Sequence, residues 1–128
     1  MKKILVVEDN PQNLQLITYA LVRAGYEVIG AASGEEGVET TIRERPLFII
    51  MDVQLPGIDG LEATRRIRSS PANGDIPIIA MTSFAMKGDR EKLLEAGCTS
   101  YFEKPIDPIT IIQQIHACLG IGEKSCES

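Results

Sequence analysis

The chain has 128 residues, of which 44% are hydrophobic and 24% are charged, enough for one compact domain with a buried core but not for two. Its formal net charge is −5. We therefore expect no direct nucleic-acid partner, because phosphate binding needs clustered Lys and Arg side chains, and the sequence has no such cluster.

The first part of the chain predicts two strand-helix units. Residues 4–7 form a continuous β-rich run, and Asn10-Pro11 then supplies the N-cap and the first residue of a helix. Apolar residues recur along this helix at the spacing of one face, until Gly25 ends it. Residues 26–31 form the second predicted strand, and a helix capped by Ser33 follows.

The rest of the chain predicts three more units of the same kind. Residues 47–51 are apolar at every position, as expected of a central strand buried on both faces. The loop at 53–60, punctuated by proline and glycine, leads to a third helix. Residues 76–81 form strand four before a fourth helix, residues 99–103 form strand five, and the last helix starts at Asp107-Pro108.

Five strand-helix units imply an α/β fold with a doubly wound, five-stranded parallel sheet in the flavodoxin-like order 2-1-3-4-5, flanked by five helices. In the last helix, four apolar residues have the spacing of a face turned to the core: Ile109, Ile112, Ile115 and Leu119. We expect residues 1–120 to form the domain and residues 121–128 to be a short flexible C-terminal tail.

Reactive polar residues directly follow four of these strands. They are Glu8 and Asp9 after strand one, Asp52 after strand three, Thr82 after strand four and Lys104 after strand five. The carboxyl ends of parallel strands meet at one edge of the sheet, where open α/β sheets bind their ligands. We therefore expect these five side chains to gather at that edge.

Three carboxylates at one edge require a counter-charge. Strands one and three are neighbours in the expected order, about 4.8 Å apart, so Glu8, Asp9 and Asp52 converge. Two carboxylates about 4 Å apart repel by about 4 kcal/mol at an effective dielectric constant of about 20. Lys104 supplies part of the compensation, and Mg²⁺, which binds carboxylates, carbonyls and water, would supply the rest.

This set of groups suits phosphoryl transfer. A carboxylate beside Mg²⁺ can attack phosphorus in line, while the cation, the Thr82 hydroxyl and the Lys104 ammonium hold the equatorial oxygens. Asp52 is the predicted nucleophile, because it lies in the middle of the sheet between Asp9 and Thr82. The product would be an aspartyl phosphate.

Several motifs of this chain resemble those of response regulator receiver domains (CheY-like), over about residues 3–119. They are Val7-Glu8-Asp9-Asn10, Met51-Asp52-Val53-Gln54-Leu55-Pro56, Asp59-Gly60, Ala80-Met81-Thr82 and Glu103-Lys104-Pro105. The resemblance implies a two-component response regulator, in which the receiver is a phosphoacceptor switch. Such a switch catalyses only its own phosphorylation and dephosphorylation and is not an enzyme with an external substrate.

The resemblance also implies roles for individual residues. Asp52 would accept a phosphoryl group from a phosphohistidine on a sensor histidine kinase or a histidine phosphotransfer protein. Mg²⁺ would be held by Asp9, Asp52 and the backbone carbonyl of Gln54, with Glu8 acting through water. The Lys104-Pro105 peptide bond is expected to be cis.

The resemblance further implies a two-state change in which Thr82 moves toward the phosphate and Tyr101 turns inward. The plainer interpretation of Tyr101 is a half-buried strand residue. The surface of helix four, strand five and helix five would change shape for a downstream protein target. Phe84 would hinder the hydrolytic water, or would only pack in its loop.

Three further residues have open or ordinary interpretations. Asn13 and Leu16, on the first helix beside the acidic pair, would contact the phosphodonor or serve only core or solvent roles. His116, the only histidine, is predicted to be an ordinary surface or boundary residue without a partner.

Membrane and secretory segments are not predicted. The apolar run at 4–7 is too short for a signal peptide, and no stretch is long enough to span a bilayer. Three cysteines without metal-ligand spacing indicate reduced thiols: Cys98, Cys118 and Cys126. We therefore expect a cytoplasmic protein with no membrane partner.

Two other protein classes share part of this pattern. A haloacid-dehalogenase-type phosphatase needs a second carboxylate two residues after the nucleophile, where this chain has Gln54. A flavodoxin cradles a phosphate in its first loop, and Glu8 and Asp9 would repel that group. A receiver domain excised from a larger regulator or hybrid histidine kinase stays an alternative, although Met1 at the start of strand one favours a free-standing protein.

Overall fold

The computed structural model describes residues 2–70, 74–83, 87–104 and 106–119. Within these ranges five strands form one sheet in the order β2-β1-β3-β4-β5, and every neighbouring pair is parallel. The strands are β1 (Lys3–Val7), β2 (Glu27–Ala31), β3 (Phe48–Asp52), β4 (Ile78–Thr82) and β5 (Ser100–Glu103). The predicted doubly wound sheet and its strand order are confirmed.

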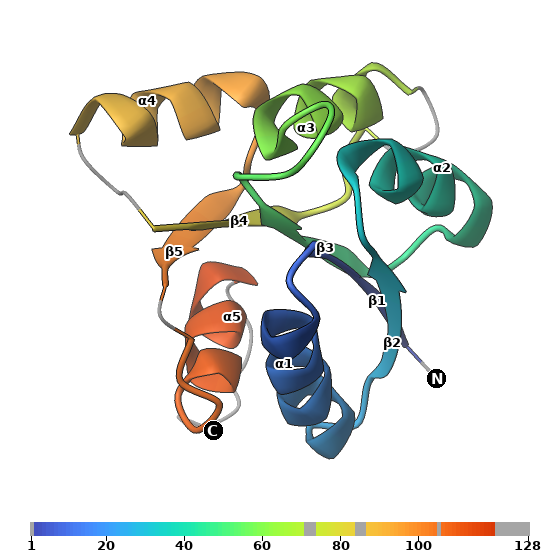
Figure 1. Cartoon of the computed structure of the whole chain (residues 1–128), viewed down its shortest axis with the longest axis vertical. Coiled ribbons are helices and arrows are strands. Elements are labelled where there is room, and N and C mark those ends of the chain that lie inside the picture. Colours follow the sequence, from blue (N-terminus) through green and yellow to red (C-terminus); the bar gives the residue numbers. More distant parts are fainter. Residues whose placement is uncertain (1, 71–73, 84–86, 105, 120–128) are drawn as a thin grey trace.

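Five helices cover the two faces of this sheet. They are α1 (Pro11–Arg23), α2 (Gly34–Glu44), α3 (Gly60–Ser69), α4 (Lys87–Ala96) and α5 (Ile111–Leu119). Figure 1 shows α1 and α5 on one face of the sheet and α2, α3 and α4 on the other. None of the helices in the described ranges has the length and apolarity that a membrane span requires.

The predicted helix caps are present. The Asn10 side chain accepts hydrogen bonds from the backbone N–H groups of Gln12 and Asn13, at 2.9 and 3.1 Å, and Pro11 opens α1. Gly25 follows α1 with a φ of +99°, a left-handed conformation that favours glycine. Ser33 accepts from the backbone N–H of the third residue of α2, so short-range signals define the start of both helices.

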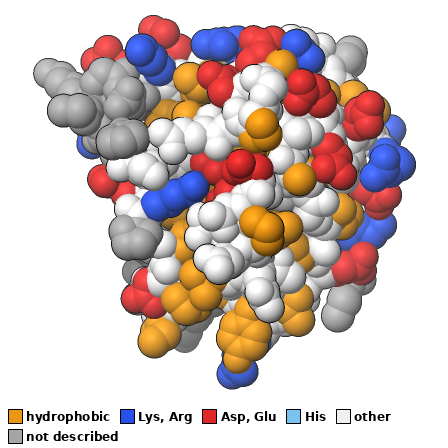
Figure 2. Space-filling model, in the orientation of Figure 1, with side chains coloured by type: hydrophobic (Ala, Val, Ile, Leu, Met, Phe, Trp, Pro, Cys, Tyr) orange, Lys and Arg blue, Asp and Glu red, His pale blue; other side chains and the backbone are white. Residues whose placement is uncertain are grey.

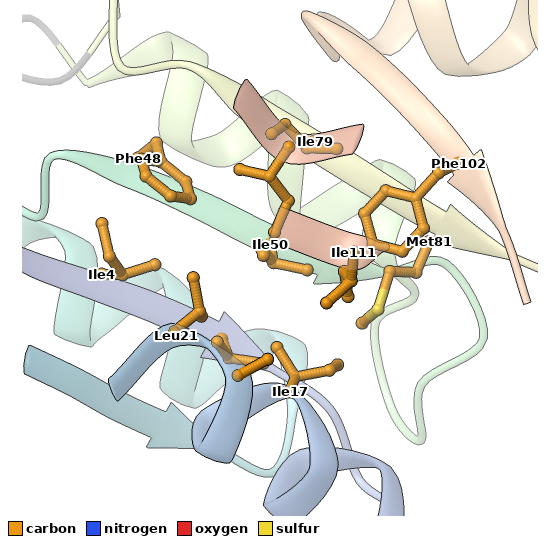
Figure 3. Packing of buried hydrophobic residues seen from close by; sticks show 12 residues of the cluster. Ile4, Ile17, Leu21, Phe48, Ile50, Ile79, Met81, Phe102 and Ile111 are labelled. Carbon is orange, nitrogen blue, oxygen red and sulfur yellow. The ribbon is translucent and has the colours of Figure 1, made fainter. Parts of the chain in front are cut away.

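The sheet separates two hydrophobic cores. One core lies between the sheet and α1 and α5; Figure 3 shows Ile4, Ile50 and Ile79 of the strands packed toward Ile17 of α1 and Ile111 of α5. The other core lies under α2, α3 and α4. Because successive strand residues point to opposite faces, strands covered on both sides are apolar at almost every position.

Several predicted details are wrong. Strand four was expected over residues 76–81 but is β4 at Ile78–Thr82, and β2 and β5 each start one residue later than expected. Leu47 is 46% exposed and precedes β3, which extends instead from Phe48 to Asp52 and is buried throughout. Ile109 is 84% exposed, while Ile111 and Ile115 are buried. Asp107 accepts a hydrogen bond from the Ile109 N–H in a turn that precedes α5, so the helix starts later and leaves Ile109 outside it, while the predicted Ile112 and Leu119 pack partly buried against the core.

The two described cysteines contribute to the two cores. Cys98 is buried, Cys118 is partly buried, and both are free thiols. Burial raises the pKa of the Cys98 thiol above its usual range, which keeps it protonated. Cys126 and the rest of the predicted tail lie outside the described residues.

Candidate functional site

The hydrogen-bonded ladder of the sheet continues one residue beyond several strands and places the candidate residues side by side. The Glu8 N–H donates to Ala31 O at 2.9 Å, and the Lys104 N–H donates to Thr82 O at 2.8 Å. Asp52, the last residue of β3, pairs with Met81 of β4. The ends of β1, β3, β4 and β5 therefore form one edge that carries all the predicted reactive side chains.

The structure brings the three carboxylates of this edge together. Glu8, Asp9 and Asp52 each have a carboxylate oxygen within 4.8 Å of the others. Asp9 is exposed, whereas Glu8 and Asp52 are each only 1% exposed. In Figure 2 acidic side chains lie in the middle of the visible face with a basic side chain beside them, and the exposed Asp9 gives the cluster a side toward solvent.

Asp52 is held at both of its carboxylate oxygens. The Lys104 ammonium donates to Oδ2 at 3.1 Å, and the backbone N–H of Gln54 donates to Oδ1 at 3.1 Å. The same ammonium lies 3.5 Å from Glu8 Oε1. Lys104 thus compensates two buried carboxylates at once, which leaves the cluster with a net negative charge.

Glu8 has one satisfied and one unsatisfied oxygen. Its Oε2 accepts the backbone N–H of Asn10 at 3.1 Å, while among the described residues Oε1 is the one buried side-chain polar atom without a hydrogen-bond donor. Burial, together with the neighbouring Asp52 carboxyl, raises the pKa of Glu8 to about 7. A cation, or a water bound to one, would give Oε1 a partner and would counteract the rise in the pKa of Glu8.

These features fit a hard divalent cation. Mg²⁺ binds carboxylate and backbone carbonyl oxygens. The cluster provides carboxylate oxygens, and the main chain of Gln54 lies next to Asp52. Cysteine and histidine take no part in the cluster, so a site for a softer metal is not indicated.

The two predicted switch residues lie on neighbouring strands. Thr82 is 5% exposed at the end of β4. Tyr101 is half-buried on β5, opposite Ala80, and the Arg90 guanidinium of α4 lies 5.6 Å from the centre of its ring. Arg90 was missed from the sequence, because nothing in the spacing of α4 links it to a residue on the following strand.

A groove beside the cluster includes two more predicted residues. Asn13 and Leu16 of α1 line it together with Ser83, Lys104 and Ile106. Phe84 and Pro105 lie outside the described residues, so the expectations for the phosphate lifetime and for the Lys104-Pro105 bond stay predictions.

His116 differs from its prediction. Its Nε2 lies 2.9 Å from the hydroxyl of Tyr26, with which it shares a hydrogen bond, and the two rings are in edge contact. The prediction that it lacks a partner is wrong, because helical spacing reveals only neighbours on the same helix and Tyr26 precedes β2. The contact joins α5 to the segment between α1 and β2 and is remote from the acidic cluster.

A doubly wound α/β domain that gathers carboxylates, a hydroxyl and an ammonium at the carboxyl edge belongs to the class of open α/β proteins that bind their ligands at this edge. The family model for the response regulator receiver domain matches residues 4–116. The chain therefore belongs to the response regulator receiver family and functions in two-component signal transduction.

Individual relatives agree with this assignment. The chain is 40% identical over 119 residues to the polar-differentiation response regulator DivK of Brucella anthropi, covering 93% of this chain and 97% of that protein. The fold is similar to that of the chemotaxis response regulator CheY4 of Vibrio cholerae, with a TM-score of 0.88, 29% identity and coverage of 92% and 98%.

A third relative bears on the metal. The receiver domain of the sensor histidine kinase PA1611 from Pseudomonas aeruginosa is 39% identical to this chain, with a TM-score of 0.84 and coverage of 93% and 98%. The crystal structure of that domain has a magnesium ion coordinated in its active site cleft.

Proposed function

We propose that the protein accepts a phosphoryl group on Asp52 from a phosphohistidine of a sensor histidine kinase or a histidine phosphotransfer protein. The observation that carries this proposal is the setting of Asp52, a buried carboxylate that contacts Lys104 at 3.1 Å beside two further carboxylates. Receiver domains pair with histidine kinases as phosphodonors, which supports the class of donor.

Mg²⁺ is the proposed cofactor. Asp9, Asp52 and the backbone carbonyl of Gln54 would hold it, and Glu8 would act through a bound water. When bound, the cation would offset the charge of the carboxylates and stabilise the charge that develops on the phosphoryl oxygens. The unsatisfied Oε1 of Glu8 and the magnesium in the relative from Pseudomonas aeruginosa support this assignment.

The chain's own residues then perform the transfer. A carboxylate oxygen of Asp52 forms the new bond to phosphorus while the P–N bond of the donor breaks, and the electron pair of that bond stays on the imidazole nitrogen. The Lys104 ammonium, already at Asp52, and the Thr82 hydroxyl stabilise the phosphoryl oxygens. The product is an acyl phosphate on Asp52.

The phosphorylated protein would act as a switch. Thr82 would move toward the phosphate and Tyr101 would turn inward, which would break the contact between its ring and Arg90. The added charge biases this change because it attracts the hydroxyl and the ammonium locally. The surface formed by α4, β5 and α5 would then bind a downstream protein target.

Incubation with acetyl phosphate tests this function. We expect a hydroxylamine-labile adduct of one phosphoryl group, measured by intact mass spectrometry, that forms only with Mg²⁺ and is absent in Asp52→Asn. An adduct that persists in Asp52→Asn, or one that forms equally without Mg²⁺, would contradict the proposal. Sustained turnover of external phosphate esters would indicate a phosphatase instead.

A further inference from the structure

The first residue of α3 packs directly against the backbone of the proposed phosphoacceptor. Gly60 is buried, and its N–H donates to Val53 O at 3.0 Å. A Cβ atom at this position would lie 2.8 Å from Val53 Cα and 3.0 Å from the carbonyl carbon of Asp52, and still closer to the Asp52 carbonyl oxygen. All three are main-chain atoms of Asp52, the last residue of β3, or of Val53, which follows it. No side-chain rotation can therefore make room for a Cβ atom.

This requirement for glycine is steric and not conformational. The described glycines with positive φ are Gly25, Gly57 and Gly97, so Gly60 has a backbone that alanine can adopt. Helix propensity alone would favour alanine over glycine within α3. The lack of a side chain at this position therefore serves the close approach of α3 to β3.

We infer that Gly60 is a positioning residue for phosphoryl transfer at Asp52. The inference rests on the function proposed above. By allowing α3 to close against Asp52 and Val53, Gly60 holds the loop that connects β3 to α3, and with it Gln54, against the acidic cluster.

Contacts at both ends of this loop support the inference. At its start the Gln54 N–H donates to Asp52 Oδ1, at 3.1 Å. At its end Asp59 caps α3, and the buried Thr64 hydroxyl donates to Gly60 O at 2.8 Å. The hydrogen bond from Gly60 to Val53 closes the loop between these two points. The loop is therefore fixed by the position of the first turn of α3.

A methyl group at position 60 must separate this turn from β3 or displace the main chain of Asp52. Either movement changes the placement of Asp52 and Gln54 relative to Lys104. Because small displacements of reacting or ligating groups are costly, we expect Gly60→Ala to weaken Mg²⁺ binding about tenfold and to slow phosphorylation by acetyl phosphate at least about tenfold.

Two other glycines provide matched controls. Gly97 lies between α4 and β5, at the opposite edge of the sheet, with a φ of +109°, and a Cβ there would lie 2.8 Å from the Arg68 side chain. Gly97→Ala should therefore lower the thermal stability without changing Mg²⁺ affinity. A Cβ at Gly74 would make only ordinary contacts, at 3.5 Å or more, so Gly74→Ala should change neither property.

Three measurements on each variant test the inference: the Mg²⁺ affinity from isothermal titration, the rate of adduct formation and the melting temperature. Mg²⁺ affinity and rate in Gly60→Ala equal to those of the parent would overturn it. An equal loss of Mg²⁺ affinity in Gly97→Ala would also overturn it, because general destabilisation would then suffice. A parent protein that binds no Mg²⁺ or takes no phosphoryl group would refute the proposed function instead.

A second pair of variants covers the case in which Gly60→Ala does not fold. Thr64→Val removes the hydroxyl that holds the Gly60 carbonyl, and Thr64→Ser keeps it. We expect weaker Mg²⁺ binding in the valine variant than in the serine variant. Equal affinities in the two would overturn the inference.

Discussion

At the scale of single residues, the site depends on charge compensation that is incomplete in the protein alone. Lys104 contacts both buried carboxylates, at 3.1 Å from Asp52 and 3.5 Å from Glu8, but one ammonium cannot balance three acidic groups. Because Glu8 is buried beside Asp52, it retains its proton to a higher pH than an exposed carboxyl would. The state of Glu8 is therefore coupled to the binding of a cation.

This coupling predicts a pH dependence of stability. The pKa of Glu8 is raised from 4.5 to about 7 in the folded protein, so the folded state binds this proton more tightly than the unfolded state does. Without Mg²⁺, the free energy of unfolding should therefore fall as the pH rises from about 4.5 through 7. Mg²⁺ competes with the proton, and it should raise the melting temperature more at pH 8 than at pH 6.

Glu8→Gln provides the control for this prediction. The substitution removes the titrating group and keeps a side chain of similar size. In this variant Mg²⁺ should therefore raise the melting temperature by nearly the same amount at pH 6 and at pH 8. An unchanged difference in this variant would show that another group is responsible. Thermal unfolding followed by circular dichroism is the measurement.

At the scale of elements, Arg68 connects α3 to two loops at the edge of the sheet opposite the acidic cluster. Its guanidinium donates to the backbone carbonyls of Gly97 at 2.9 Å, Gly74 at 3.0 Å and Ile76 at 2.6 Å. These carbonyls belong to the segments that lead into β4 and β5. One side chain therefore ties the segments before β4 and β5 to α3.

Replacement of this arginine should be costly. Arg68→Met keeps the apolar stem but removes every donor, so we expect the free energy of unfolding to fall by about 2 kcal/mol. Arg65→Met removes an exposed arginine of the same helix whose ion pair with Glu62 is 3.6 Å long, and it should change stability by less than about 0.5 kcal/mol. Urea denaturation measures both, and equal effects would contradict the role of Arg68.

Elements also differ in how well they could be predicted. The end of β1 was predicted correctly and the ends of β3 and β4 to within one residue, because a polar residue interrupts an apolar run, and the start of α1 was evident from Asn10 and Pro11. The start of α5 was not, because Asp107-Pro108 has the pattern of a helix start, whereas the structure uses Asp107 in a turn before Ile111. Local patterns cannot distinguish these two uses of the same residues.

At the scale of the whole molecule, the sheet order and the meeting of the three carboxylates followed from the alternation of strands and helices. Contacts between distant segments did not follow from it. The bond between Tyr26 and His116, the contact of Arg90 with Tyr101 and the approach of Gly60 to Asp52 all depend on how helices pack on the finished sheet. Spacing along the chain carries no signal for such contacts.

The hydrogen bond between Tyr26 and His116 supplies a prediction at this scale. It joins α5 to the residue before β2 at 2.9 Å and is partly buried, so Tyr26→Phe should lower the free energy of unfolding by about 1 kcal/mol. The Tyr19 hydroxyl accepts from Arg23 at 3.2 Å on an exposed surface, and Tyr19→Phe should be nearly neutral. Chemical denaturation measures the free energy of unfolding of both variants. An equal loss of this free energy in the two would show that the bond to His116 contributes nothing specific.

The gathering of the site from four separate strands has a consequence for how the molecule is made. Glu8 and Lys104 are almost a hundred residues apart in the sequence, and the lysine contacts Glu8 and Asp52 from the end of the last strand. A fragment that lacks either β1 or β5 therefore lacks part of the reactive set. On the proposed function, phosphorylation of Asp52 therefore requires the assembled sheet.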